Sequence, residues 1–249
     1  MTEVGEKRPE YFYKYMPFNA ARTVLETRKL RWTDPVEFND PFDGSLKILD
    51  AIDRNQLGRI FPDADDPLDY LLMHCRTLLP FFRVLCFSSK CDVAPMWAHY
   101  ADLHRGVVLK FRTNERGRES SPWIIAKKVD YQHELVLSAQ DVADSLQKDG
   151  ENEQFRHFLQ KWLCIKHPDW QHEYEWRCFT LSNLGEPPRY CHWGVDADDF
   201  EGVYFGLNMS EQNKAELIFY ADKYPNMKFF NSRIDGTRLV FDEFLLEMR

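Results

Sequence analysis

Short segments rich in aromatic and branched apolar residues recur along the chain, and several of them alternate apolar with polar positions. This spacing of two is typical of β-strands, in which successive side chains point to opposite faces. The predicted strands cover residues 11–15, 30–33, 82–88, 106–111, 123–131, 170–179, 203–205, 227–231 and 239–241. The segment 82–88 is largely apolar, so we expect it at the centre of a sheet.

Apolar positions at helical spacing separate these strands. Asn19 is a candidate N-cap for a helix that buries Ala21, Val24 and Leu25. Further helices are predicted from Asp66-Pro67 to Leu79, over 95–101, over 138–166 with an interruption near Asp149-Gly150, and after a Ser210 cap. The order of elements predicts an α+β fold with a mixed, largely antiparallel sheet flanked by helices. We expect a flexible lead-in over residues 1–10 and one compact domain over residues 11–249.

Residues 34–44 combine two prolines with small polar turn formers, which excludes regular structure. Phe38 and Phe42 nevertheless call for burial, so an ordered loop is predicted. Asn39, Asp40 and Asp43 could bind a cation, a sugar hydroxyl or an amide there. The alternative is that these residues only form the hydrogen-bonded turns that Asn and Asp favour next to proline.

Composition narrows the class of protein. The 249 residues are 44% hydrophobic, which is ordinary for a globular chain, and the net charge of −8 disfavours nonspecific attraction to nucleic acid or anionic membranes. We expect a cytoplasmic protein, since no apolar run approaches a membrane span and the N-terminus lacks a secretory segment. The six scattered cysteines contain no Cys-x-x-Cys pair, which favours reduced core thiols.

The most informative stretch is the predicted strand over residues 170–179. On strand geometry Glu173, Glu175 and Arg177 share one face, and the two carboxylates stand about 7 Å apart along the chain. They could act on one ligand while each raises the proton affinity of the other, with Arg177 offsetting the repulsion. A solvated face or a structural ion-pair ladder is the alternative interpretation.

Other candidate residues lie where strands and helices end. His99, Tyr100 and His104 could supply acid, base or hydrogen-bond chemistry, and Ser88 ends the central strand, where ligand-binding hydroxyls often lie. Core packing competes for Trp97 and Tyr100, and a helix-capping loop position competes for His104. The chain lacks a Gly-x-Ser-x-Gly elbow, a phosphate-binding glycine loop, a dinucleotide fingerprint and a His-Glu-x-x-His motif.

Several short motifs, taken together, resemble those of a known family. They are Tyr13-Lys14-Tyr15, Phe38-Asn39-Asp40-Pro41-Phe42-Asp43, Cys86-Phe87-Ser88, Met96-Trp97-x-His99-Tyr100, His104-x-Gly106 and Trp170-x-x-Glu173-x-Glu175-x-Arg177. Together they resemble the bacterial family called domain of unknown function 2971, over about residues 11 to 206. That family name implies no activity.

A weaker resemblance is to ADP-ribosyltransferases, which build an NAD site from residues on three successive strands. It places Lys14 in the first position, Ser88 or Tyr100 in the second and Glu175 in the third, with Glu173 completing a Glu-x-Glu pair. The resemblance implies cleavage of the nicotinamide glycosidic bond and transfer of ADP-ribose to an acceptor, protein or nucleic acid, of unknown identity. NAD would be a co-substrate, with no tightly bound cofactor and no metal.

The same resemblance implies individual roles. Glu175 would stabilise the cationic sugar and orient the ribose, Tyr100 or Trp97 would stack on the nicotinamide, and Lys14 or Arg177 would face the diphosphate. The remaining residues that we expect to contact the substrate are Asn39, Asp40, Ser88, His99 and His104.

Two other classes of function stay open. One is a non-catalytic binding or interaction protein, for example in a bacterial conflict or defence system, in which the charged strand is structural. The other is a metal-dependent hydrolase that assembles His99, His104, His172 and the two glutamates, although none of these shows the close helical spacing that sharpens a metal site.

Overall fold

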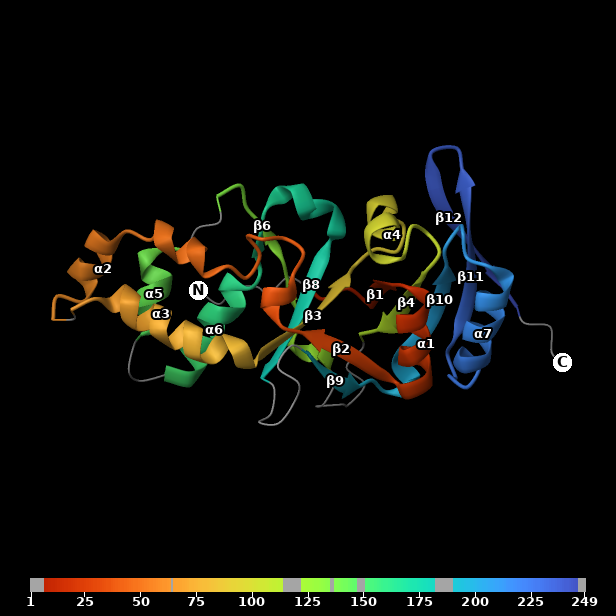
Figure 1. Ribbon diagram of the computed structural model, residues 1–249, viewed down its shortest axis with the longest axis horizontal. Coiled ribbons are helices and arrows are strands. Elements are labelled where there is room, and N and C mark those ends of the chain that lie inside the picture. Colours follow the sequence, from red (N-terminus) through yellow and green to blue (C-terminus); the bar gives the residue numbers. More distant parts are fainter. Residues whose placement is uncertain are drawn as a thin grey trace.

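A ten-stranded, mostly antiparallel sheet runs through the middle of the molecule (Figure 1). The computed structural model describes residues 7–63, 65–113, 122–134, 137–146, 151–181 and 190–245. Within them the sheet comprises β1 (Tyr11–Met16), β2 (Lys29–Thr33), β3 (Phe82–Ser88), β4 (Val107–Arg112), β5 (Lys127–Lys128), β8 (Glu175–Leu181), β9 (Tyr190–Gly194), β10 (Phe200–Phe205), β11 (Lys228–Asp235) and β12 (Arg238–Phe244). A separate parallel pair joins β6 (Asp130–Tyr131) to β7 (Ile165–Lys166).

Helices cover the two ends of this sheet (Figure 1). They are α1 (Phe18–Thr27), α2 (Arg54–Ile60), α3 (Pro67–Leu78), α4 (Ala94–Tyr100), α5 (Ala139–Ser145), α6 (Glu151–Trp162) and α7 (Glu211–Ala221). Helices α2, α3, α5 and α6 gather at one end, where an apolar cluster includes Leu71, Leu159 and Trp162. Helices α1 and α7 pack against a second cluster at the other end. The predicted α+β class and the single compact domain are confirmed.

Two of the three predicted N-cap residues cap their helices, and one does not. Asp66 accepts from two backbone N–H groups at the start of α3, and Ser210 accepts from Asn213 at the start of α7, as predicted. The predicted Asn19 cap is wrong. Helix α1 begins at Phe18, directly after Pro17, whose fixed φ of −67° sets the extended entry without a side-chain cap.

Three predicted elements need correction. Residues 168–173 form a 3₁₀ turn, η6 (Pro168–Glu173), so the charged strand begins only at Glu175. Pro168 follows the His167 cap at the first helical position, where its missing N–H costs nothing. The predicted strand over 123–131 is a 3₁₀ turn followed by β5 and β6. The helical stretch over 138–166 divides into α5, α6 and β7, and its predicted interruption at 149–150 lies outside the described residues.

The sheet forks at β3, and this fork creates the site. One edge of β3 pairs with β8 along seven residues. The other edge pairs with β1 only at Tyr13 and Ser88, and with β2 only at Thr33 and Val84. Strands β1 and β2 therefore diverge beside β3, and the Lys14 ammonium crosses the gap to donate to the Cys86 carbonyl at 2.8 Å. A side chain satisfies this backbone acceptor where the neighbouring strands have separated.

The link from α4 to β4 is unusually tight. Asp102, Leu103 and His104 all have left-handed φ values, between 48° and 66°. A Cβ at the following Gly106 would stand 2.3 Å from the Met16 carbonyl oxygen, so only glycine fits. This close approach fixes α4 against the end of β1 and so positions the Tyr100 side chain.

The remaining expectations concern the chain ends and the thiols. The first six residues of the predicted lead-in lie outside the described residues, whereas Glu10 accepts from the Thr113 amide through its backbone carbonyl. All six cysteines are free, as predicted. In the part of the chain that the structure describes, no helix has the length and apolarity to cross a membrane. Phe42 is 66% exposed, contrary to the burial expected for it.

Candidate functional site

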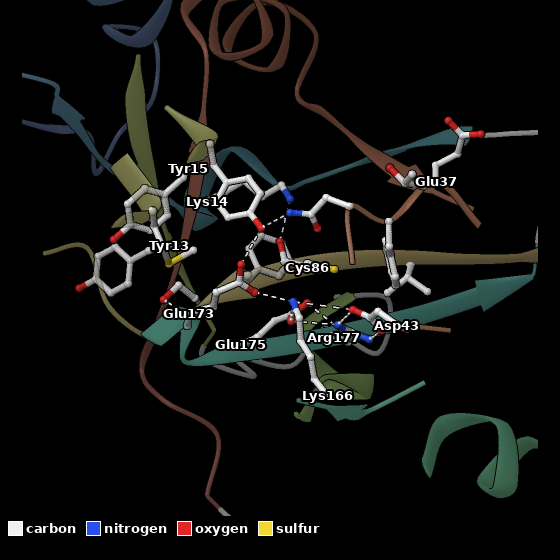
Figure 2. A pocket seen from close by; sticks show the side chains of 18 of the residues that line it. Tyr13, Lys14, Tyr15, Glu37, Asp43, Cys86, Lys166, Glu173, Glu175 and Arg177 are labelled. Carbon is white, nitrogen blue, oxygen red and sulfur yellow. Dashed lines mark hydrogen bonds and ion pairs between the residues drawn. The ribbon is translucent and has the colours of Figure 1, made fainter. Parts of the chain in front are cut away.

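A cavity of about 340 Å³ opens at the fork between β1, β2 and β3 (Figure 2). It is also lined by α4, β7, the start of β8 and the loop over residues 37–43. Eight of the candidate residues from the sequence line it, namely Lys14, Asn39, Asp43, Ser88, Tyr100, Glu173, Glu175 and Arg177. Its volume falls at the lower end of the range for small-molecule sites.

Arg177 is the centre of a buried charge network. Its side chain is fully buried, and all five guanidinium N–H groups donate hydrogen bonds. Two reach the Asp43 carboxylate at 2.7 and 2.5 Å, two reach Glu175 at 2.8 and 2.9 Å, and one reaches the Leu163 carbonyl. Burial disfavours the charged guanidinium, but the two carboxylates outweigh this effect and hold the pKa of Arg177 well above its ordinary value.

Lys166 links the two glutamates. Its ammonium donates to Glu173 at 2.6 Å and to Glu175 at 2.9 Å, and the Lys166 side chain is 4% exposed (Figure 2). Burial lowers the proton affinity of this amine, yet the carboxylates of Glu175 and Glu173 leave its pKa raised. Burial raises the pKa of Glu175. The charges of Arg177 and Lys166 outweigh burial and lower the carboxyl pKa far below its ordinary value. Glu175 is therefore ionised at neutral pH.

The carboxylates of Asp43, Glu173 and Glu175, with Lys166 and Arg177, form the acidic wall of the cavity. Tyr100 lies beside this wall. Its hydroxyl donates to Glu173 at 2.6 Å and accepts from the Asn39 side-chain amide at 3.0 Å. Burial and the neighbouring Glu173 carboxylate raise the pKa of the Tyr100 phenol, so it stays protonated and remains a donor.

Hydrogen bonds from the end of β3 fix the turn that places Glu173 in the cavity. The residue after it, Tyr174, has a left-handed φ of 48°, which redirects the chain from η6 into β8. The Ser88 hydroxyl donates to the Glu173 carbonyl at 2.7 Å, and the Ser89 amide donates to the Tyr174 carbonyl at 3.0 Å. The end of β3 thus fixes the turn, and both glutamates reach one cavity although they do not lie on one continuous strand.

The opposite wall carries cations. Lys14 enters from β1 and Arg31 from β2, and neither forms an ion pair with a described residue. Burial lowers the pKa of Lys14. Arg31 stacks over the Tyr190 ring at 4.9 Å. The Cys86 thiol also lines the cavity, next to the Glu175 carboxylate, and burial raises its pKa well above its ordinary value. The wall that carries Lys14 and Arg31 can receive an anionic group.

The charges of the network do not cancel. Three carboxylates (Asp43, Glu173 and Glu175) face two cations (Lys166 and Arg177), which leaves a formal charge of −1 at the acidic wall. Lys14 and Arg31 stand across the cavity. The arrangement suits a ligand that is cationic at one end and anionic at the other, because each end then meets a complementary field.

Four other candidate residues lie outside this lining. Trp97 is fully buried, donates to the Cys91 carbonyl and stacks on His104, so it serves the core. His99 is exposed on α4. The Asp40 side chain is buried and accepts from the Phe42 amide, which is the turn interpretation, and its second oxygen has no described partner.

The candidate histidines are not among the residues that line the cavity. Burial lowers the pKa of His104, whose Nδ1 has no described partner, and Nδ1 of His172 contacts the Asp169 carbonyl. Among the described residues no group of three or more His, Cys, Asp or Glu side chains could hold a metal ion.

Sequence reasoning missed Lys166 and assigned Asp43 no definite partner. Lys166 ends the apolar run Leu163-Cys164-Ile165, and a lone lysine at such a place is a usable signal for a buried charge. Asp43 meets Arg177 across 134 residues of sequence, so no local pattern reveals that pair.

Comparison with known proteins identifies one family. The family model described as protein of unknown function (DUF2971) matches residues 96–178, about a third of the chain. The matched stretch contains Tyr100, Lys166, Glu173, Glu175 and Arg177, whereas Lys14 and Asp43 lie outside it. The chain is thus similar to this family over Glu173, Glu175 and the two cations that pair with them, Lys166 and Arg177. No curated protein and no solved structure matches it.

Proposed function

We propose that the cavity binds NAD and that the protein transfers ADP-ribose from it to an acceptor. The observation that carries the proposal is the pairing of an acidic wall of net charge −1 with Lys14 and Arg31 on the facing wall. The nicotinamide riboside end of NAD is cationic and its diphosphate is anionic. The cationic end faces the acidic wall, and the diphosphate faces the two basic side chains.

The two glutamates then have different roles. An ionised carboxylate can accept about four hydrogen bonds. Glu175 already accepts three from Arg177 and Lys166, whereas Glu173 accepts only two, from Tyr100 and Lys166. Glu173 therefore has more capacity left for a ribose hydroxyl. Glu175 positions Lys166, which in turn orients Glu173.

The reaction breaks the bond between the ribose C1′ and the nicotinamide nitrogen. Nicotinamide leaves with the bonding electron pair, and positive charge develops on the sugar ring, where the Glu173 carboxylate stabilises it. An acceptor hydroxyl or amine attacks C1′ and gives up its proton to solvent. The positive charge thus moves from the nicotinamide ring to the sugar, and a carboxylate placed against the sugar stabilises the transition state more than the bound substrate.

The decisive experiment measures nicotinamide release from NAD by the wild type and by two variants. Glu173→Gln keeps the shape but removes the charge that faces the sugar, and we expect release to fall by about 10²- to 10³-fold, as when a single stabilising group is removed. Glu175→Gln should also lower release, with a loss of stability because it disturbs Lys166 and Arg177.

Matched controls separate chemistry from folding. Glu211→Gln changes an exposed carboxylate on α7, whose pairing with Lys214 on the surface contributes little. A thermal shift with NAD reports binding by itself, since a ligand bound to the native state raises the melting temperature. Binding without release would instead assign the chain to the non-catalytic class. Release unchanged in Glu173→Gln would refute the role given to that residue.

A further inference from the structure

A second hollow adjoins the cavity on the face of the sheet that α4 covers. It is an open groove of about 550 Å³ between β10, β11, β12 and residues 89–92. Tyr13 lines both the cavity and the groove. Ser88 lines the cavity and the next residue, Ser89, lines the groove. The two hollows are therefore neighbours, separated by little more than the Tyr13 side chain.

The groove has an aromatic floor. Tyr204 of β10 and Phe230 of β11 are register partners, and their rings stack at 4.3 Å with an angle of 8°. Phe241 and Tyr13 approach Tyr204 edge-on, at 5.0 and 6.0 Å. Phe230 and Phe241 are only half-buried, so part of each ring stays accessible. A flat heteroaromatic ring is the natural occupant of such a surface.

One cation of the groove lining has no carboxylate partner among the described residues. Lys90 lines the groove, and its ammonium lies 4.2 Å above the ring of Tyr174, which connects Glu173 to Glu175. No described carboxylate pairs with Lys90. An anionic linker that passes from the cavity to the groove would meet this ammonium.

We propose that the groove binds the adenine ring of the same NAD molecule whose nicotinamide riboside occupies the cavity, with Lys90 contacting the diphosphate between them. The inference rests on the proposed function for the identity of the ligand. Three observations carry it: the shared Tyr13 wall, the aromatic floor, and the Lys90 ammonium in the groove, which lies over the ring between Glu173 and Glu175. A cavity of 340 Å³ would otherwise leave the distal half of a dinucleotide without contacts.

One half-buried cysteine in each hollow provides the test. Cys86 lines the cavity and Cys91 lines the groove, while the other four cysteines are buried and serve as internal controls. Burial raises the pKa of the Cys91 thiol to about 12 and that of Cys86 well above its ordinary value, so both react slowly. Alkylation over hours at mildly alkaline pH, quantified by peptide mass spectrometry, then reports the occupancy of each hollow.

Three probes distinguish the subsites. AMP should slow alkylation of Cys91 at least about fivefold and leave Cys86 unchanged. Nicotinamide mononucleotide should protect Cys86 alone, and NAD should protect both thiols. Protection of Cys86 but not Cys91 by saturating NAD overturns the groove proposal.

Two variants locate the contacts. Phe230→Leu removes an aromatic face and keeps the apolar volume, and Lys90→Gln removes the ammonium charge. Each should raise the AMP concentration needed for half-protection of Cys91 about tenfold, the fold-change expected for loss of one base-stacking or charge-assisted contact. The controls are Phe219→Leu and Lys47→Gln, at exposed positions outside both hollows, which should not change it.

The groove proposal and the transferase proposal fail in different ways. Protection of Cys91 by AMP without any release of nicotinamide from NAD supports the groove and refutes the transferase. Release of nicotinamide with no protection of Cys91 supports the transferase and refutes the groove. If neither Phe230→Leu nor Lys90→Gln changes the AMP concentration needed for half-protection of Cys91, the assignment of the adenine to the aromatic floor of the groove is overturned.

Discussion

Replacement of Arg177 by methionine should be among the most destabilising single changes in this fold. The change removes five hydrogen bonds at once and leaves the Asp43 and Glu175 carboxylates buried without their main counter-ion. Breaking a buried ion pair on one side typically costs about 3–5 kcal/mol. That is a large share of the roughly 5–15 kcal/mol that stabilises a typical domain.

The pH dependence of the variant gives the sharper test. In the wild type the pKa of Glu175 is lowered, so its contribution is present above the ordinary value of about 4.3 and is lost only as pH falls through the lower folded value. Without Arg177, burial should raise the folded pKa of Glu175 above its unfolded value. The variant should then regain stability as pH falls from 7 towards 5, while the wild type should not.

Urea unfolding followed by tryptophan fluorescence measures both effects. Arg177→Lys provides a graded control, since an ammonium keeps the charge but has three donors in place of five. It should lose about 2–3 kcal/mol, less than Arg177→Met. Adding Glu175→Gln to Arg177→Met should recover part of the loss, because one uncompensated charge disappears. A loss below about 1 kcal/mol for Arg177→Met, or no recovery at lower pH, would refute the reasoning.

Three further changes test other parts of the structure by urea unfolding. Gly106→Ala should lower the free energy of unfolding by about 3 kcal/mol because the new Cβ would stand 2.3 Å from a backbone oxygen. Gly58→Ala, in α2 with nothing within 4 Å of the new Cβ, should raise the free energy of unfolding by about 0.5–1 kcal/mol. Lys14→Met leaves the Cys86 carbonyl without its side-chain donor, but it also removes an ammonium whose pKa burial lowers, so the free energy of unfolding of the variant relative to the wild type should fall as pH rises towards the ordinary lysine value; a difference that does not change with pH would contradict this. Tyr100→Phe should lose about 1–2 kcal/mol with its hydrogen bond to a buried carboxylate, and an unchanged midpoint would show that the bond is not made.

Much of the framework follows from local sequence. The strand Phe82–Ser88 was predicted at its observed bounds because its residues up to Phe87 are apolar except for Arg83, and serines follow them. The α3 helix follows from the Asp66 cap and Pro67, which act within four residues. Where a cap or an apolar period decides the structure, the sequence is sufficient.

The turn before β8 shows where local patterns fail. Alternation alone extends the strand back to Trp170, but Pro168 favours a helical turn and Tyr174 takes a left-handed conformation that Ser88 and Ser89 hold from β3. Partners 85 residues away thus decide the conformation. The two glutamates still reach one cavity, so the prediction of a shared pocket survives although the predicted geometry is wrong.

The charge network could not be predicted for the same reason. Lys166 lies on a two-residue strand, and Asp43 lies in a loop that is far from Arg177 in sequence. Their meeting depends on how the loop over 34–44 and the segment after α6 pack beside β8. Sequence periodicity shows which side chains need a partner, but it does not show which distant segment supplies one.

Because main chain frames the opening between β1 and β2, its outline is independent of the side chains that fill it. The ladder from β3 to β8 and the single contacts at Tyr13 and Thr33 hold the rim in place. Residues on the rim can therefore be exchanged with little effect on the scaffold, as in folds whose loops carry different chemistries on one framework. Proteins with this forked sheet should differ in what they bind more readily than in how they fold.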